Sequence, residues 1–413
     1  MRYDAIVIGA GPSGSSAAIA LAQQGRAVAI IERADFPRRK VCGEFISAVN
    51  LQLLDRLGIG EAVLANAGPP VERLALFASG PGVEARMPRA RINAFGRALG
   101  RDVLDTMLLQ AAGDVGVDVF QPWRAVEIAK AGDVQSIRIE ASGQSHILTA
   151  PVVIAAHGSW EQGKLASNLK KSNGDSDYFG FKATFKGGAL ASNLMPLLAF
   201  PGGYGGMVWT DESRISLSCC VRRDALATIR KASGNLPAGQ AVYRHILAAC
   251  PGVAQALADA KMERDWLAAG PIRPGIRPRY ADDIFRVGNL AGESHPIIAE
   301  GISMALQSGW LLATELGRVA DWAQASRAQA GRRYAKAWSK QFATRIYLAS
   351  ALAALAGLPP TADLMRRAVG LFPAVLSLGA RLSGKTWDVP NAGELALGSG
   401  QDRGLDARLP PQS

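Results

Sequence analysis

Three side chains in this 413-residue sequence combine reactive chemistry with a local sequence that suggests a site. Cys42 and Glu44 end the stretch RRKVCGE, residues 38–44, whose basic residues would favour a thiolate at Cys42. Glu44 could take a phenolic or indolic proton as a general base, or it could form a salt bridge with Arg39 or Lys40. His295 could donate a proton to a reacting group, or be an ordinary loop histidine. Cys42, Glu44 and His295 are therefore the catalytic candidates, with shaping of the pocket as the other role open to Cys42.

The cysteines and histidines do not form a metal-binding pattern. The sequence has four cysteines without a CxxC pair, and four histidines, so no zinc-binding set can be assembled. Four cysteines are also too few to hold a chain of this length together by disulfides. We therefore expect no metal, and reduced cysteines in a cytoplasmic protein.

A glycine-rich turn near the N-terminus predicts a dinucleotide site. The apolar run YDAIVIG, residues 3–9, is typical of a strand, GAGPSG continues it, and a small-residue helix follows. A second apolar strand, AVAIIE, ends at Glu32. In this context Gly9 allows the tight turn, Gly11 lets a pyrophosphate approach the backbone, and Gly14 lets the helix pack on the strand. Glu32 would accept hydrogen bonds from ribose hydroxyls, which fits either NAD or FAD.

Three later segments distinguish between these cofactors. FPRRKVCGE, residues 36–44, follows the second strand, and GRDVLDTMLL predicts a helix with Arg101 and Asp105 on one face. From residue 287, VGNLAGESHPIIAEGISMALQSGWLLA leads through a glycine-rich turn into a helix at Gly301. Together with the glycine-rich turn of residues 9–14, these segments resemble the FAD-dependent monooxygenase superfamily, which has the aromatic hydroxylase fold. The closer resemblance is to the branch of geranylgeranyl reductases and flavin-dependent halogenases, which has PxxKxCGxx, RxxxD and GDAxGxxxPxxGxGI motifs at these places.

The resemblance implies non-covalent FAD, with two departures from the family pattern. Asn289 stands where the family has the Asp of GDA, although an amide can still hydrogen-bond ribityl hydroxyls. His157 and Gly158 replace an Asp-Gly pair that takes part in nicotinamide handling in the aromatic hydroxylases. The electron donor therefore stays open between NADPH or NADH and a separate flavin reductase. The residues expected to bind FAD are Gly9, Gly11, Ser13, Gly14, Glu32, Arg33, Lys40, Cys42, Arg101, Asn289, Gly292, Gly301 and Ile302.

The resemblance implies an α/β fold in which a Rossmann-type FAD-binding domain carries an inserted antiparallel-sheet substrate domain, and a helical C-terminal region is expected to follow. An Arg/Ala-rich helix is expected to end at Arg345, followed by an apolar helix over 346–358. The predicted domains are residues 1–70, 95–164 and 271–330 for FAD, 71–94 and 165–270 for substrate, 331–385 for the C-terminal helices, and 386–413 as a flexible tail.

Charge and hydropathy limit the partners. With 46 basic and 35 acidic residues the net charge is +11, yet no pattern of nucleic-acid recognition accompanies it. The apolar stretch over 346–358 is shorter than the roughly 20 residues that span a bilayer. We therefore expect no nucleic acid and no transmembrane segment, and leave peripheral membrane contact open.

The resemblance favours one activity over two others. The first expectation is an FAD-dependent monooxygenase that hydroxylates an electron-rich aromatic or unsaturated substrate through a flavin C4a-hydroperoxide. The substrate would be a small molecule, or a large one tethered to a carrier or partner protein. The alternatives are an FAD-dependent C=C reductase of geranylgeranyl reductase type and a flavin-binding maturation or assembly protein. A halogenase is disfavoured because the WxWxIP motif of tryptophan halogenases is absent.

Overall fold

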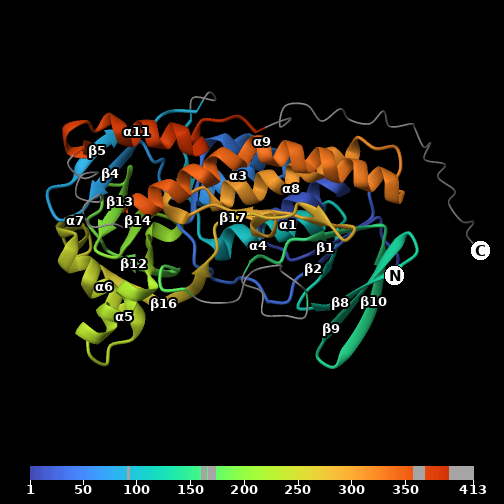
Figure 1. The fold of residues 1–413 in the computed structure, drawn as a ribbon, viewed down its shortest axis with the longest axis horizontal. Coiled ribbons are helices and arrows are strands. Elements are labelled where there is room, and N and C mark those ends of the chain that lie inside the picture. The colour runs from blue at the N-terminus through green and yellow to red at the C-terminus, as the bar shows by residue number, and fades with distance from the viewer. Residues whose placement is uncertain (91–93, 160–164, 166–173, 357–367, 390–413) are drawn as a thin grey trace, which may run out of the picture.

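A computed structural model describes residues 1–90, 94–159, 165, 174–356 and 368–389 (Figure 1). One half of the fold is built on a six-stranded sheet with the strand order β18-β19-β11-β1-β2-β7. All neighbouring strands in it are parallel except β18 and β19. Three central strands are buried throughout, which explains their continuous apolar sequences. The strands are β1 (Ala5–Ile8), β2 (Val28–Ile31), β7 (Asp118–Phe120), β11 (Val152–Ala155), β18 (Tyr280–Ala281) and β19 (Ile284–Arg286).

Both faces of this sheet are covered. On one face, α1 (Pro12–Ala22), α4 (Arg101–Asp114) and α8 (Gly301–Gly317) share a core with the strands. On the other face lies a three-stranded antiparallel sheet of β8 (Arg124–Ala131), β9 (Val134–Ala141) and β10 (Gln144–Ala150). Helices α1 and α8 approach closely, because a Cβ on Gly309 would lie 2.2 Å from the Ser13 carbonyl oxygen. This contact fixes the start of α1 against α8.

A seven-stranded sheet with the order β16-β12-β15-β14-β13-β4-β5 forms the other half. The expected antiparallel pairing holds for every neighbour except β13 and β4, which are parallel. Helices α5 (Arg223–Ala232), α6 (Ala238–Ala249) and α7 (Pro251–Ala256) pack with this sheet in a second core. Its strands are β4 (Arg73–Phe77), β5 (Val83–Arg86), β12 (Tyr178–Lys186), β13 (Leu194–Phe200), β14 (Gly203–Trp209), β15 (Ile215–Arg222) and β16 (Lys261–Ile272).

The C-terminal region is helical, as expected, but its first helix differs from the prediction. Helix α9 (Gln324–Ala356) runs unbroken through Arg345, where a helix end was predicted. No glycine or proline lies between Tyr334 and Ala356, so nothing interrupts the backbone hydrogen bonds there. Helix α11 (Ala374–Ala380) and the π-helical turn η5 (Arg381–Lys385) follow. Residues 357–358 of the expected apolar helix, and 390–413 of the expected tail, lie outside the described residues.

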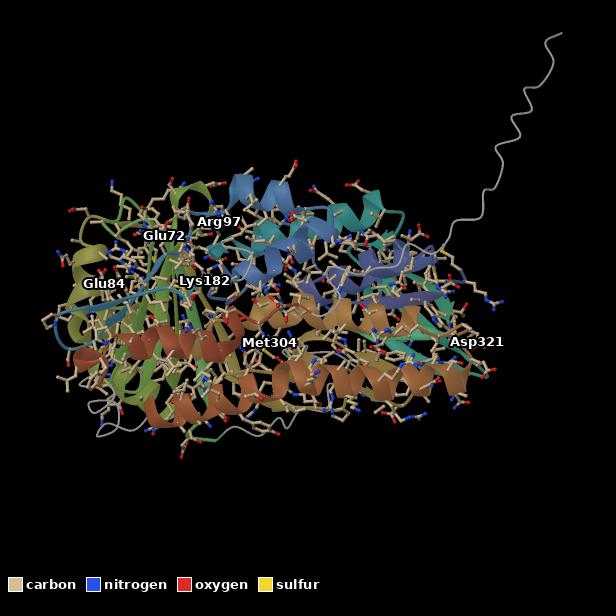
Figure 2. All side chains as sticks on the ribbon, turned by 90° about the horizontal axis from the view of Figure 1, so that it is seen from above. Glu72, Glu84, Arg97, Lys182, Met304 and Asp321 are labelled. Atoms are coloured by element: carbon tan, nitrogen blue, oxygen red, sulfur yellow. The ribbon has the colours of Figure 1, made fainter. Side chains whose placement is uncertain are left out.

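Short elements join the two halves at the start of α8. Figure 2 shows Lys182 on the seven-stranded sheet, Asp321 beyond the end of α8 at the far side, and Met304 in the first turn of α8 between them. Among the described residues, no helix has both the length and the hydropathy needed to cross a membrane. The joining elements are β3 (Phe45–Ile46), η1 (Ala48–Asn50), α2 (Leu51–Arg56), α3 (Gly60–Asn66), β6 (Arg97–Ala98), η2 (Asp211–Ser213), β17 (Gly275–Ile276), η3 (Gly288–Leu290), β20 (Gly292–Glu293) and η4 (Pro296–Ile298).

The predicted fold class is confirmed: a Rossmann-type α/β half, a largely antiparallel second sheet and C-terminal helices. The domain boundaries stay a prediction. Helix α9 starts at Gln324 and therefore crosses the boundary that was placed at residue 330.

Candidate active site

A cavity of about 360 Å³ lies between the two halves of the fold, within the size range of small-molecule sites. One part of its wall comes from the β1–α1 turn, residues 38–45 and residues 288–305, and the other comes from β12 to β16. Of the thirteen residues expected to bind FAD, twelve line this cavity; Gly14 does not. Cys42 and Glu44 also line it, whereas His295 does not. Motifs that are far apart in the sequence therefore meet at one site.

Each of the three glycines in the N-terminal turn is required for a different structural reason. Gly9 has a φ of 106°, and a Cβ there would lie 2.7 Å from the Ala156 carbonyl oxygen. A Cβ on Gly14 would lie 1.9 Å from the carbonyl oxygen of Gly9, so Gly14 permits the packing of α1 on β1. A Cβ on Gly11 would meet no described atom closer than 3.8 Å. Gly11 thus faces open space at the N-cap of α1, which is the arrangement that a pyrophosphate requires.

Glu32 holds the glycine turn in place. Its carboxylate accepts hydrogen bonds from the backbone N–H of Ala10 (2.9 Å) and of Ala34 (3.0 Å). The Arg38 guanidinium lies 3.3 Å from the same carboxylate, which is almost fully buried. The acidic residue at the end of the second strand therefore shapes the turn as well as facing the cavity, where it could accept ribose hydroxyls.

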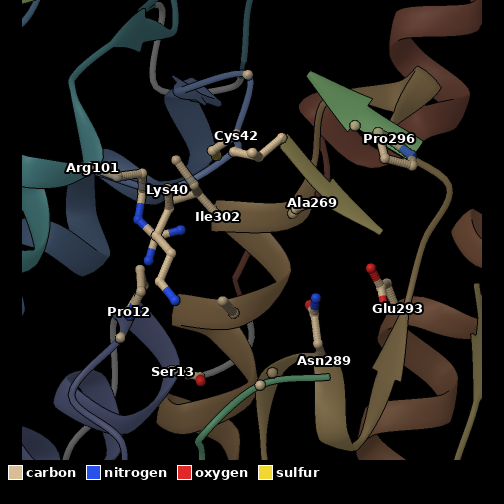
Figure 3. A pocket seen from close by; sticks show the side chains of 18 of the residues that line it. Pro12, Ser13, Lys40, Cys42, Arg101, Ala269, Asn289, Glu293, Pro296 and Ile302 are labelled. Carbon is tan, nitrogen blue, oxygen red and sulfur yellow. The ribbon is translucent and has the colours of Figure 1, made fainter. Parts of the chain in front are cut away.

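Three cations line the cavity beside the start of α1. Figure 3 shows Lys40 and Arg101 extending toward Pro12. Burial, with Arg38 and Arg101 nearby, lowers the pKa of Lys40 to about 8. Burial also lowers the pKa of Arg38, although Glu32 and Asp105 oppose the shift. A bound diphosphate would relieve this repulsion, so the residues present fit the anionic part of FAD.

Arg101 is fixed by the acid one turn later in its helix. Its Nε donates to Asp105 Oδ1 and its Nη2 to Asp105 Oδ2, both at 2.7 Å. Burial alone would lower the pKa of Arg101, but the Asp105 carboxylate raises it above the ordinary value. The i, i+4 pair expected from the sequence is therefore present, with Arg101 at the cavity wall and Asp105 buried behind it. Arg38, which was not among the predicted FAD-binding residues, joins the pair, with its Nη2 3.7 Å from Asp105 Oδ2.

The late glycine-rich segment forms the opposite wall. Gly301 and Ile302 begin α8, so their free backbone N–H groups face the cavity. Asn289 points into the same space in Figure 3, and its Nδ2 lies 3.4 Å from Ser159 Oγ. The preceding Ala299 has a φ of 51°, a left-handed conformation that turns the chain into the helix. A flat ring can approach this helix start at Gly301, where a Cβ would meet no described atom within 4 Å.

Glu44 has an ion partner that was not predicted, and its role as a general base stays a prediction. It lines the cavity, but its Oε1 accepts hydrogen bonds from Lys182 Nζ and from the backbone N–H of Arg101 (3.0 Å). The expected salt bridge to Arg39 or Lys40 is therefore wrong, because the ion partner is Lys182 on β12, with both side chains buried. Lys182 was missed because it lies 138 residues away in sequence. The Glu44 backbone N–H in turn points to Cys42 Sγ at 3.4 Å, which holds the thiol at the cavity wall.

His295 lies one layer behind the wall. Its Nδ1 shares a hydrogen bond with the hydroxyl of Tyr204, and Tyr204 lines the cavity. Burial lowers the pKa of His295 to about 4, so its imidazole is neutral at pH 7. Tyr178 packs edge-on against the same ring. Any proton from His295 would therefore pass through Tyr204.

His157 replaces the acidic residue of the family pattern and lines the cavity directly. Burial, followed by the positive charges of Arg286 and Arg33, lowers its pKa to about 4. Neither ring nitrogen has a hydrogen-bond partner among the described residues. A neutral imidazole with free donor and acceptor positions thus faces the site, where the family has a carboxylate.

Comparisons with known proteins agree with this geometry. A family model described as "FAD binding domain" matches residues 2–223. Digeranylgeranylglycerophospholipid reductase of Methanocaldococcus jannaschii is 24% identical over 358 residues, which are 80% of this chain and 82% of that protein. Kynurenine 3-monooxygenase of Salinispora arenicola is 26% identical over 324 residues, covering 74% and 70%.

The fold comparison includes the flavin-dependent brominase Bmp2, with a TM-score of 0.72, 19% identity, and coverage of 93% of this chain and 94% of that one. The resemblance stated from the sequence is confirmed by these matches. Because the family model covers more than half of the chain and the cavity fits its cofactor, this protein belongs to the FAD binding domain family, as an FAD-dependent oxidoreductase.

Proposed function

We propose that this protein is a monooxygenase that uses FAD to hydroxylate an electron-rich aromatic or unsaturated substrate. The observation that carries the proposal is the continuity of the cavity. The start of α1, with its free backbone N–H groups, and an apolar wall of the seven-stranded sheet line one continuous cavity. Such a space can hold a substrate against the flavin ring while keeping water out, which is the protein's share of oxygen transfer.

Different residues of the cavity would bind the cofactor and the substrate. When bound, FAD supplies the reducing electrons and the reaction with O₂. The start of α1, Lys40 and Arg101 would hold the diphosphate, and Glu32 positions the turn. The substrate side is mainly aliphatic and excludes water from the reacting atoms, through Met195, Leu197, Met207, Val208 and Ile272.

The electron donor is part of the proposal. NADPH or NADH would have to be handled without the family's acidic residue at His157, whose neutral ring offers no charge. A separate flavin reductase fits this difference better. Oxidation of NADPH by the purified protein alone, at the rate of substrate turnover, would exclude the need for such a partner.

One observation favours a C=C reductase as the second candidate. Cys42 lies on the cavity wall, where a thiol could give a proton to a carbon that accepts hydride. The similarity to digeranylgeranylglycerophospholipid reductase is compatible with this activity, as the similarity to kynurenine 3-monooxygenase is with oxygenation.

The two candidates make different products. FAD-loaded protein would be incubated with a reductant, O₂ and a cell extract, and the products compared by mass with a boiled control. We expect a product that gains one oxygen atom, and ¹⁸O label when ¹⁸O₂ is supplied. A product that gains two hydrogen atoms without label would favour the reductase instead.

A further inference from the structure

Glu293, at the end of β20, is an acidic residue of the cavity wall that the arrangement above leaves without a role. Glu32 is held by two backbone N–H groups, and Glu44 by Lys182. Glu293 Oε2, like Glu44 Oε2, has no hydrogen-bond partner among the described residues, but Glu293 lacks an ion partner as close as Lys182 is to Glu44. Figure 3 shows its side chain projecting into the same space as Asn289.

The nearest positive charge compensates Glu293 only weakly. Arg277 Nη2 lies 3.6 Å from Glu293 Oε2, which is longer than a hydrogen bond. The guanidinium is instead engaged with backbone carbonyls, of Asn289 at 2.5 Å and of Arg273. A buried carboxyl with such weak compensation is poised to bind a donor from a ligand.

The surroundings of Glu293 keep it close to its titration point at neutral pH. Burial raises its pKa to about 7, while Arg277 and the Ser159 hydroxyl act in the opposite direction. From β15, Cys220 also faces it, but burial raises the pKa of that thiol to about 12, so it stays uncharged. Trp338 on α9 packs behind it, against Gly292. Arg277 is therefore the charged group that faces Glu293 in the described part of the chain.

We propose that Glu293 is the catalytic base of this site, and that the substrate is an aromatic ring carrying an N–H or O–H group that this carboxylate accepts. The inference rests on the proposed function. In the reaction, the heteroatom proton moves to a Glu293 oxygen, and the electron pair left behind raises the electron density of the ring.

The remaining steps balance the reaction. A ring carbon forms its bond to one oxygen atom of O₂, and the other oxygen atom leaves as water with two electrons from the reductant and two protons. The hydrogen of that ring carbon then moves as a proton to the newly attached oxygen atom, which becomes the hydroxyl, and the proton on Glu293 returns to the heteroatom. Glu293 is again a carboxylate at the end of the cycle, and a hydroxyl group has replaced one hydrogen atom of the ring.

This placement also predicts specificity. A substrate without a donor would bury the carboxylate unpaired, and a site with an unpaired buried polar group rejects such an analogue strongly. The aliphatic side chains of the wall, such as Leu197 and Val208, cannot make that distinction, because they contact rings by shape alone.

The test uses the oxidised, FAD-loaded protein under anaerobic conditions, with two probe pairs: phenol and anisole, and indole and N-methylindole. Binding is followed by the change in the flavin absorption spectrum at about pH 6 and pH 8. We expect the donor probes to bind ten- to a hundredfold more tightly than their methylated partners, the scale of one hydrogen bond to a charged group. The preference should be larger at pH 8, where Glu293 is ionised.

Two variants test whether Glu293 causes the preference for donor probes and its pH dependence. Glu293→Gln should lose the pH dependence and most of the preference, while Glu127→Gln, an exposed residue of β8, should keep both. The infrared band of a protonated carboxyl should titrate near pH 7 in the wild-type protein and be absent from the Gln variant. Equal binding of both members of each pair by the wild-type protein, or a preference retained in Glu293→Gln, would overturn the assignment.

Failure of this inference can be told apart from failure of the proposed function. The binding and infrared measurements need no O₂ and no turnover. If they succeed while no ¹⁸O enters any product, then oxygenation is wrong and Glu293 remains a donor-recognising carboxylate. If ¹⁸O enters a product while the probe pairs bind equally, then the monooxygenase stands without this base.

Discussion

Gly11 and Gly14, three residues apart at the start of α1, should respond differently to substitution, and the structure gives the reason. Gly11→Val puts a side chain into the cavity, where even the nearest described atom, Arg101 Nη2, lies 3.8 Å from a Cβ. The backbone there has a φ of −73° and a ψ of 177°, which valine adopts without strain. Gly14→Ala instead drives a Cβ to 1.9 Å from the Gly9 carbonyl oxygen.

The expected magnitudes follow from these contacts. For Gly11→Val we expect about 1 kcal/mol of lost stability in the FAD-free protein, the scale of a poorer N-cap. Its FAD affinity should fall by ten- to a hundredfold, because about one charge-assisted hydrogen bond from the turn to the pyrophosphate is lost. For Gly14→Ala the FAD-free protein itself should lose roughly 1–3 kcal/mol or more, because α1 must move away from β1.

Thermal unfolding of the FAD-free proteins and FAD titration by fluorescence quenching measure the two effects separately. Gly25→Ala, in a turn where a Cβ meets no described atom within 4 Å but φ is 78°, provides a control that is strained without touching the cavity. The reasoning is refuted if Gly11→Val binds FAD as tightly as the wild-type protein, or if Gly14→Ala leaves the FAD-free protein fully stable.

Three further outcomes are expected. Glu32→Ala should weaken FAD binding by about 1–3 kcal/mol and also lower the melting temperature of the FAD-free protein, because the Ala10 N–H loses its buried acceptor; an unchanged dissociation constant would count against it. Stability should fall as the pH drops from about 6.5 toward 4, because His157 and His295 have folded-state pKa values of about 4, below the ordinary 6.5. The loss between pH 7 and pH 5 should be about 2 kcal/mol for each histidine, and His157→Asn should remove its share in a denaturant titration; an equal loss in that variant would contradict the pKa. Cys42→Ser should keep a substantial oxygenation rate, because oxygen transfer needs shape and dryness more than a thiol, whereas a loss of about 10²–10⁴ would indicate proton donation in a reductase.

Local motifs carried most of what could be predicted. The β1–α1 turn, the Arg101–Asp105 pair and the start of α8 are each set by residues within a few positions of one another, so spacing alone placed them. The two halves of the fold were expected from the resemblance to the family that these motifs carry. The long apolar and Ala-rich stretch of α9 was divided wrongly, because a change of composition at Arg345 is not a helix break.

The parts that could not be predicted depend on contacts distant in sequence. The Lys182–Glu44 pair joins two halves of the fold, and the parallel pairing of β13 with β4 brings together residues about 120 positions apart. The position of His295 behind Tyr204, and of Glu293 at the wall, depends on how β20 and η4 pack against the second sheet. The sequence contains a faint signal for Glu293, an acid inside the glycine-rich flavin segment, but not its burial or its weak pairing with Arg277.

The measurement that tests the central claim most directly is a single turnover without O₂. FAD-loaded protein would be reduced chemically in a sealed cell, mixed with the substrate found by the extract screen, and divided into an anaerobic half and an aerated half. The account predicts no product until O₂ is admitted, and then a product that carries one oxygen atom from it. Product formed from the reduced protein in the absence of O₂ would contradict the monooxygenase.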